Sequence, residues 1–273
     1  MTIRVHHLEC GRMNPRGGFF LYGSSHHRHL VCHCLLLELP DRLVLVDSGI
    51  GLADVADAKR RLGGFFVSNM RPRLEPGDTA AQRIEALGLR TEDVRDIIVT
   101  HLDLDHAGGL SDFPHARVHV AAAELAVAQS RPRRADRMRY RPIQWAHGPD
   151  WRTYGATGEA WNGFPAVRDL DGLPPEVLMI PLFGHSLGHS GIAIDTGTGW
   201  LLHCGDAYFH RGEVDRTAPR CPALLRAFQQ VVAADDVARR ANQARLRELF
   251  ATPVAEVTMF CAHDTEELEA LRE

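Results

Sequence analysis

The stretch Thr100-His101-Leu102-Asp103-Leu104-Asp105-His106-Ala107-Gly108-Gly109 decides how this chain is interpreted. It follows the apolar run Ile97 to Val99, whose β-branched residues are typical of a buried strand. Four side chains of metal-binding type therefore come just beyond a predicted strand end: His101, Asp103, Asp105 and His106. The alternative is a polar loop that holds these residues by chance, and their density within so short a stretch argues against it.

The spacing of the four residues predicts that they converge if the strand direction continues into the motif. Alternate side chains of a strand point to opposite faces, so His101, Asp103 and Asp105 would share one side while the intervening leucines face the core. The glycine pair that follows would let the chain turn tightly, so that His106 swings back beside Asp105. Imidazole nitrogens mixed with carboxylates suit zinc, manganese or iron.

The composition is that of an ordinary globular protein. The chain has 273 residues, 45% of them hydrophobic and 24% charged, which favours one large domain over residues 1–273. The formal net charge of -4 is too small to indicate a nucleic-acid or membrane partner. Lys59 is the only lysine, so a Schiff-base mechanism can be set aside.

The sequence favours a cytoplasmic location. Residues 1–7 lack the uninterrupted apolar segment of a secretory signal, and no later run approaches the roughly 20 apolar residues of a membrane span. The six cysteines are scattered without a Cys-x-x-Cys pair, which favours buried free thiols over a disulfide framework. A small-molecule substrate is the expected partner, and a homodimer stays open.

The remaining pattern predicts strands and helices in two halves. The first half opens with residues 19–22 after a break at 16–18, then with an antiparallel pair over 30–39 and 43–46. Helices are expected up to Leu87, over 121–129 and, split near Asp235, between 222 and 250. Strands are expected over 177–182 and 254–260, with a hairpin of 192–195 and 200–203. The aromatic-rich stretch 142–176 is expected to be a long ordered insertion.

Further ligand-type residues follow the predicted strands of the second half. Gly184-His185-Ser186-Leu187-Gly188-His189 comes after the strand over 177–182, Gly205-Asp206 after the hairpin and Ala262-His263 after the last strand. In the first half, Asp47-Ser48-Gly49 closes an early strand. Asp47 either forms a turn or orients a ligating histidine through a hydrogen bond, and we favour the second.

In this order the motifs resemble those of the metallo-β-lactamase superfamily, whose early Asp-Thr-Gly turn is similar to Asp47-Ser48-Gly49. The resemblance implies an α/β fold, the four-layered αββα metallo-β-lactamase sandwich, with two metals at one edge of the paired sheets. It implies a first metal held by His101, Asp103 and His185. It implies a second held by Asp105, His106 and His263, with Asp206 as the bridge. His189 is expected to play a structural or supporting part.

The implied cofactors are two divalent metal ions, with zinc favoured and manganese or iron as alternatives. Two cations about 3.5 to 4 Å apart bring the pKa of a bridging water toward neutrality, and the resulting hydroxide would attack a carbonyl carbon or a phosphorus. Asp105 would bind the second metal and accept a hydrogen bond from this hydroxide. Asp103 stands where most of the family has histidine, which makes the site more negative and leaves the metal open.

In overall look the chain is most similar to the acyl-homoserine lactone lactonase branch, which has a similar length and a tyrosine shortly after the bridging aspartate. Tyr208 would then donate a hydrogen bond to the developing oxyanion, or it is simply a packed aromatic. The first hypothesis is therefore a dinuclear hydrolase of an ester or lactone. The alternative is a phosphodiesterase or nuclease, suggested by Asp103 and by the basic run Arg131–Arg141, which can equally be a solvated face.

Overall fold

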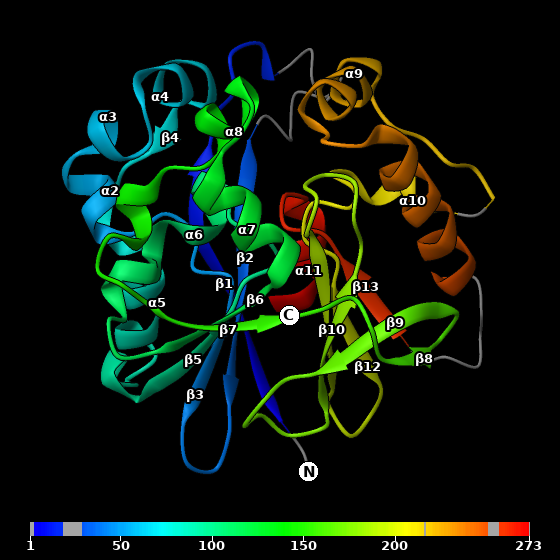
Figure 1. The fold of residues 1–273 in the computed structure, drawn as a ribbon, viewed down its shortest axis with the longest axis horizontal. Helices are drawn as coiled ribbons and strands as arrows, with labels where there is room; N and C mark the ends of the chain where they lie inside the picture. Colours follow the sequence, from blue (N-terminus) through cyan, green and yellow to red (C-terminus); the bar gives the residue numbers. More distant parts are fainter. Residues whose placement is uncertain (1–2, 19–28, 216, 251–256, 273) are drawn as a thin grey trace.

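Two β-sheets with helices on their outer faces make up this computed structural model (Figure 1). The structure describes residues 3–18, 29–215, 217–250 and 257–272. The predicted segment 19–22 and the expected start of the last strand, residues 254–256, lie outside the described residues. Within the described part, no helix is both long and apolar enough to cross a membrane.

The first sheet has seven strands in the order β4-β1-β2-β3-β5-β6-β7. They are β1 (Arg4–Met13), β2 (Leu30–Glu38), β3 (Leu43–Val46), β4 (Pro72–Arg73), β5 (Val94–Ile98), β6 (Arg117–Ala121) and β7 (Asp150–Tyr154). The antiparallel pairing of β2 with β3 is confirmed, and β3, β5, β6 and β7 run parallel. Parallel β3 and β5 end at the same edge of the sheet, so the loops that carry Asp47 and His101 are neighbours.

The second sheet has six strands in the order β13-β12-β11-β10-β9-β8. They are β8 (Glu159–Trp161), β9 (Phe164–Asp169), β10 (Val177–Pro181), β11 (Ser190–Asp195), β12 (Trp200–His203) and β13 (Val257–Phe260). The predicted hairpin is confirmed as β11 with β12. Since β13 runs parallel to β12, the loops that carry Asp206 and His263 leave the sheet side by side.

Helices cover both outer faces, as Figure 1 shows for α5 beside the first sheet and α10 beside the second. The helices are α2 (Leu52–Ala56), α3 (Ala58–Arg61), α4 (Gly64–Met70), α5 (Ala80–Ala86), α6 (Leu104–Ala107), α7 (Ala122–Ser130), α8 (Arg134–Arg139), α9 (Ala223–Val232), α10 (Asp236–Phe250) and α11 (Thr265–Arg272). Short 3-10 turns are η1 (Pro76–Asp78), η2 (Thr91–Asp93), η3 (Gly108–Asp112), η4 (Pro142–Trp145) and η5 (Arg211–Glu213). The helix over 121–129 and the split near Asp235 are confirmed as α7 and as α9 with α10.

Alternation along the strands separates three apolar layers. Leu35 and Leu37 of β2 lie in the layer between the sheets with Met179 of β10, whereas Cys34 and Leu36 lie in the layer that the first sheet shares with α5 and α7. On the other side, Ile180 packs in the layer of the second sheet and α10. Because successive strand residues face opposite sides, three apolar layers require four structural layers. The predicted αββα sandwich is confirmed.

The prediction of a long insertion over residues 142–176 is wrong. The segment supplies β7 to the first sheet and β8 and β9 to the second, so it is the crossing between the sheets. β7 pairs with β6 from Arg117 to Ala121 and so acquires its strand conformation from tertiary pairing. Its aromatic Tyr154 is buried in the layer between the sheets.

Candidate metal centre

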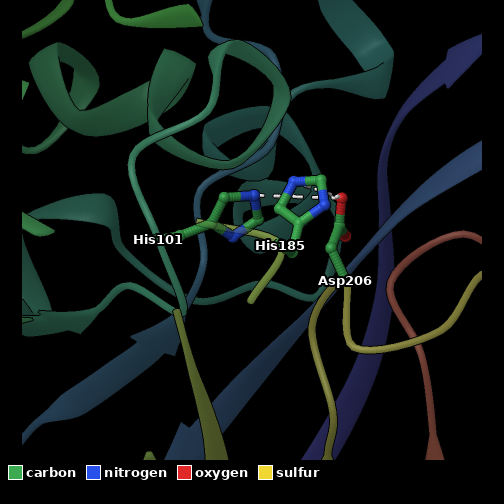
Figure 2. A group of neighbouring side chains, drawn as sticks. All are labelled: His101, His185 and Asp206. Atoms are coloured by element: carbon green, nitrogen blue, oxygen red, sulfur yellow. Dashed lines mark ion pairs between the residues drawn. The ribbon is translucent and has the colours of Figure 1, made fainter. Parts of the chain in front are cut away.

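Six buried side chains converge at the edge where the loops of both sheets meet. His101, His185 and Asp206 form one group of possible ligands, and Asp105, His106 and His263 form another. In each group the three ligand atoms lie within 4.8 Å of one another. Figure 2 shows the first group, with His101 and His185 both turned toward the Asp206 carboxylate. Residues from both halves of the chain thus meet as the motifs predicted.

Asp206 lies between the two groups. Its Oδ2 is 3.4 Å from Nε2 of His185 and 3.8 Å from Nε2 of His101. Its Oδ1 is 3.1 Å from Nε2 of His263 and 3.3 Å from Nε2 of His106. Burial opposes its ionisation, yet the surrounding imidazoles, His263 foremost, hold the pKa of Asp206 well below its usual value. Oδ2 is also 3.2 Å from Nε2 of His263, so this one carboxylate contacts imidazoles of both groups.

The motif itself does not continue as a strand. β5 ends at Ile98, and the single-turn helix α6 begins at Leu104, with the carbonyl of the preceding Asp103 accepting from the backbone N–H groups of His106 and Ala107. Asp103 itself is extended, so the expectation that His101, Asp103 and Asp105 alternate along an extended chain is wrong from Leu104 onward. The helical turn brings Asp105 and His106 together into the second group instead.

The two glycines after the motif permit close packing of two loops. A Cβ atom at Gly109 would lie 2.5 Å from the Ser48 carbonyl oxygen, and one at Gly108 would lie 2.6 Å from that of Gly49. Gly108 itself has an ordinary helical φ of -60°. The two glycines are therefore needed for the close approach of the His106 loop to the Asp47 loop, and not for the predicted tight turn.

Asp47 orients His106, as expected. Its Oδ2 lies 2.8 Å from Nδ1 of His106, and its Oδ1 accepts the Thr100 backbone N–H at 2.7 Å. The ring therefore directs Nε2 toward Asp206. Burial opposes a charge on His106, but the carboxylates of Asp206, Asp47 and Asp105 prevail and raise its pKa well above the usual value.

Two further histidines hold the backbone that carries Asp206. Nε2 of His189 accepts the Asp206 backbone N–H at 2.8 Å, while Nδ1 bonds the Leu182 carbonyl. Nδ1 of His203 accepts the Gly205 N–H at 3.1 Å, while Nε2 bonds the His33 carbonyl. Burial lowers the pKa of both rings, as their acceptor role requires. The supporting part expected for His189 agrees with this position, whereas His203 was missed because it reads as an ordinary strand residue.

Asp103 lies at the edge of the first group. Its Oδ2 is 3.0 Å from Nε2 of His185 and 3.4 Å from Nε2 of His101, while its Oδ1 is 3.1 Å from Nε of Arg139. Burial opposes its charge, but the guanidinium of Arg139 holds the pKa of Asp103 well below its usual value. Asp103 thus lies beside two possible ligands but outside both groups, and it is paired with an arginine that the motifs did not predict.

Tyr208 does not reach the candidate site. Its side chain is fully buried in the layer of the second sheet and α10, and its hydroxyl donates to Oε1 of Glu267 at 3.0 Å. The expected role as an oxyanion donor is therefore corrected to the alternative role of a packed aromatic. Phe209, the next residue, packs against the ligand-type rings instead, with its centroid 4.8 Å from that of His263.

Sequence reasoning also missed Glu124, which joins the two loops of the first group. This buried residue of α7 accepts the Leu102 N–H at 3.0 Å, the Ser186 hydroxyl at 2.6 Å and the Gly188 N–H at 3.1 Å. The Tyr140 hydroxyl donates to it at 3.0 Å. A single acidic residue in an alanine-rich helix carries no signal that distinguishes it from a solvent-exposed one.

The residues present fit a pair of divalent cations. Nε2 of His101, Nε2 of His106 and Oδ1 of Asp206 are buried and make no hydrogen bond within the described part of the chain. Buried polar atoms are rarely left without a partner, so their convergence is itself an indication of a ligand. Imidazole and carboxylate donors together match zinc, manganese or iron.

Comparison with known proteins identifies the family. The family model of the metallo-β-lactamase superfamily matches residues 27–257. A probable metallo-hydrolase of Mycobacterium tuberculosis is 42% identical over 271 residues, which cover 99% of this chain and 83% of that protein. An N-acyl homoserine lactonase of Bacillus cereus is 32% identical over 98 residues, 36% of this chain and 39% of that protein.

Solved structures share the fold. An N-acyl homoserine lactone hydrolase with the product N-hexanoyl-L-homoserine at its catalytic metal centre superposes with a TM-score of 0.72 at 20% identity, covering 99% of this chain and 97% of that one. The dizinc lactonase AidC gives a TM-score of 0.63 at 14% identity, covering 96% of this chain and 87% of that one. The family match and the shared sandwich confirm the resemblance carried by the motifs: the chain belongs to the metallo-β-lactamase superfamily of hydrolases.

Proposed function

We propose that this hydrolase binds two divalent cations and cleaves an ester or lactone bond of a small molecule. His101, Asp103 and His185 hold the first cation, and Asp105, His106 and His263 hold the second. Asp206 is shared. The observation that carries the proposal is the position of Asp206 between the two groups, with Nε2 of His106 3.3 Å and Nε2 of His185 3.4 Å from its carboxylate. Zinc is the favoured metal, with manganese or iron as alternatives.

Bound cations supply an acidic water near neutral pH and polarise the bond that is attacked. The chain's own residues organise this chemistry. The Asp47 carboxylate keeps Nε2 of His106 facing inward, and the Val31 carbonyl does the same for His263 by accepting from Nδ1 at 2.7 Å. Asp105, about 10% exposed at its side chain, is the carboxylate proposed to accept a proton from the attacking water.

A carbonyl substrate is favoured over a phosphodiester by the surroundings of the site. Within the basic run, Arg139 is paired with Asp103 inside the molecule, whereas Arg133 pairs with Asp136 at the surface and Arg134 is exposed. The arginine that reaches the site is thus already paired with a carboxylate, which is the argument against a phosphodiester substrate. The lactonase names of several relatives agree with an ester or lactone substrate.

The test is a substrate panel with defined metal content. Protein loaded with zinc or manganese is assayed against a γ-lactone with an acyl side chain, an aryl ester and bis-(p-nitrophenyl) phosphate, before and after removal of metal by a chelator. We expect lactone or ester hydrolysis that disappears with the metal and returns when it is restored. Cleavage of the phosphodiester alone, or full turnover in metal-free protein, would overturn the proposal.

A further inference from the structure

Arg139 is the member of the basic run that reaches the first group. It ends α8, and its side chain is about 14% exposed. Nε lies 3.1 Å from Oδ1 of Asp103, Nη1 donates to the His185 carbonyl at 2.7 Å, and Nη2 donates to the Val232 carbonyl at 2.6 Å. One guanidinium therefore binds a predicted ligand, the backbone of a second ligand and the end of α9.

The charges of Arg139 and Asp103 balance. Asp103 places a negative charge where a neutral imidazole is usual in the family, and the guanidinium supplies a positive charge beside it. A buried carboxylate without a partner is costly, whereas a carboxylate paired with a fixed guanidinium is tolerated. The pair thus has the net charge of the histidine that it replaces.

The same contact gives the two Asp103 oxygens different partners. Oδ1 faces Arg139, which leaves Oδ2 directed at Nε2 of His185, 3.0 Å away. The carboxylate is contacted by Nε of the guanidinium, while Nη1 and Nη2 bind backbone carbonyls and Nη2 also lies 3.4 Å from Nε2 of His185. The bond to the His185 carbonyl fixes the backbone of the second ligand from the same side.

We propose that Arg139 is a positioning residue for the first cation, matched to Asp103, which it holds in the orientation of a ligand. The inference rests on the proposed function, because it assumes that the first group holds a cation. Groups that orient metal ligands typically contribute about 10- to 100-fold to metal affinity. Arg139 contributes through Asp103 and His185, without contacting the cation itself.

The first test measures cation binding. Stoichiometry and affinity for zinc are obtained by competition with a chromophoric chelator for the wild type, R139M, R139K and the control R134M, which removes an exposed arginine of the same run. We expect R139M to lose about tenfold or more at one of two sites, R139K to lose less, and R134M to match the wild type. Unchanged or tighter binding in R139M overturns the inference. If R139M does not fold, R139K decides the test. A zinc affinity of R139K equal to that of the wild type then overturns the inference.

The second test is a double-mutant cycle that needs no cation. D103H restores the usual histidine but leaves Arg139 without the carboxylate that balances its charge. The melting temperature of the metal-free D103H protein should therefore be lower than that of the wild type. The melting temperature of metal-free D103H/R139M should be higher than that of D103H. Absence of this recovery overturns the pairing. If the wild type binds fewer than two cations, the proposed function is contradicted. The metal-free cycle would still show whether Arg139 and Asp103 stabilise one another.

Discussion

Glu267 is the carboxyl group that keeps Tyr208 away from the candidate site. It belongs to α11, accepts the Cys261 backbone N–H at 2.7 Å and bonds the Tyr208 hydroxyl. Burial, assisted by the nearby charge of Asp264, raises the pKa of Glu267 to about 8. This side chain therefore stays protonated over much of the physiological range, and as a neutral acid it can serve both neighbours.

The raised pKa of Glu267 predicts a pH dependence of stability. Its usual pKa is 4.5 and its folded value about 8, so between these values the unfolded chain releases a proton that the folded chain retains. Stability that is present below pH 4.5 is consequently lost as the pH rises through 8. We expect E267Q, whose amide keeps one donor and one acceptor, to remove a loss on the order of 4 kcal/mol over this window.

The measurement is urea unfolding of metal-free protein at pH 5 and pH 8. E269Q, at an exposed position of α11, is the control and should follow the wild type. If the free energy of unfolding changes between pH 5 and pH 8 by the same amount in E267Q as in the wild type, the prediction is contradicted.

At single positions, sequence reasoning succeeded where chemistry restricts the residue type. Few side chains bind divalent cations, so His101, Asp206 and His263 were recognisable from type and order alone, and they do converge. Tyr208 was misread because the direction of its ring depends on α11, which lies far along the chain. Arg139 was undetectable for the same reason, since its partner Asp103 belongs to another element.

At the scale of elements, α7 connects the loop after β5 with the loop after β10 through Glu124. Its carboxylate accepts from Leu102, next to His101, and from Ser186, next to His185. The helix was predictable from its alanine-rich composition, but its buried acidic residue was not. The extended form expected for the motif failed because α6 begins at Leu104, and a one-turn helix is too short to leave a periodic pattern.

E124Q should loosen this connection without dismantling the fold. A glutamine offers one acceptor oxygen where Glu124 uses two, so buried donors among Leu102, Ser186 and Gly188 lose their partner, at a cost of about 1–3 kcal/mol. We expect weaker binding of one zinc ion and unchanged binding of the other. The measurements are urea unfolding and chelator competition, with E85Q on the exposed face of α5 as control. Equal weakening at both sites would count against this role.

On the scale of the whole molecule, the candidate site takes its residues from both sheets, at one edge of the apolar layer that they share. His101, Asp105 and His106 follow β5 of the first sheet, whereas His185 and Asp206 follow strands of the second. The resemblance carried by the motifs implied this sandwich, and the two buried faces of each strand agree with it. The crossing over residues 142–176 was not predictable, since β7 and β8 acquire their strand conformation by joining existing sheets.

Removing the cations should therefore weaken the molecule without unfolding it. The three apolar layers do not depend on the site, so secondary structure measured by circular dichroism should persist in chelator at 25 °C. Hydrolysis should disappear. Zinc at about 100 times its dissociation constant adds about 2.7 kcal/mol, which corresponds to a rise of roughly 5–10 °C in melting temperature for a chain of this size.

The rise in melting temperature caused by zinc should depend on pH, and the protonation of the histidines determines the direction of that dependence. Burial opposes their charge, but in the metal-free protein Asp206 and its neighbours raise the pKa of His106 and His263 above 6.5. The stability that these protonated rings add is present below pH 6.5 and is lost as the pH rises through their folded pKa values. Zinc requires neutral rings, so the gain from zinc should grow from pH 5.5 to pH 8. Thermal melts with zinc and with chelator at both pH values measure it. A gain that is constant with pH, or larger at pH 5.5, would show that His106 and His263 do not exchange protons for a cation.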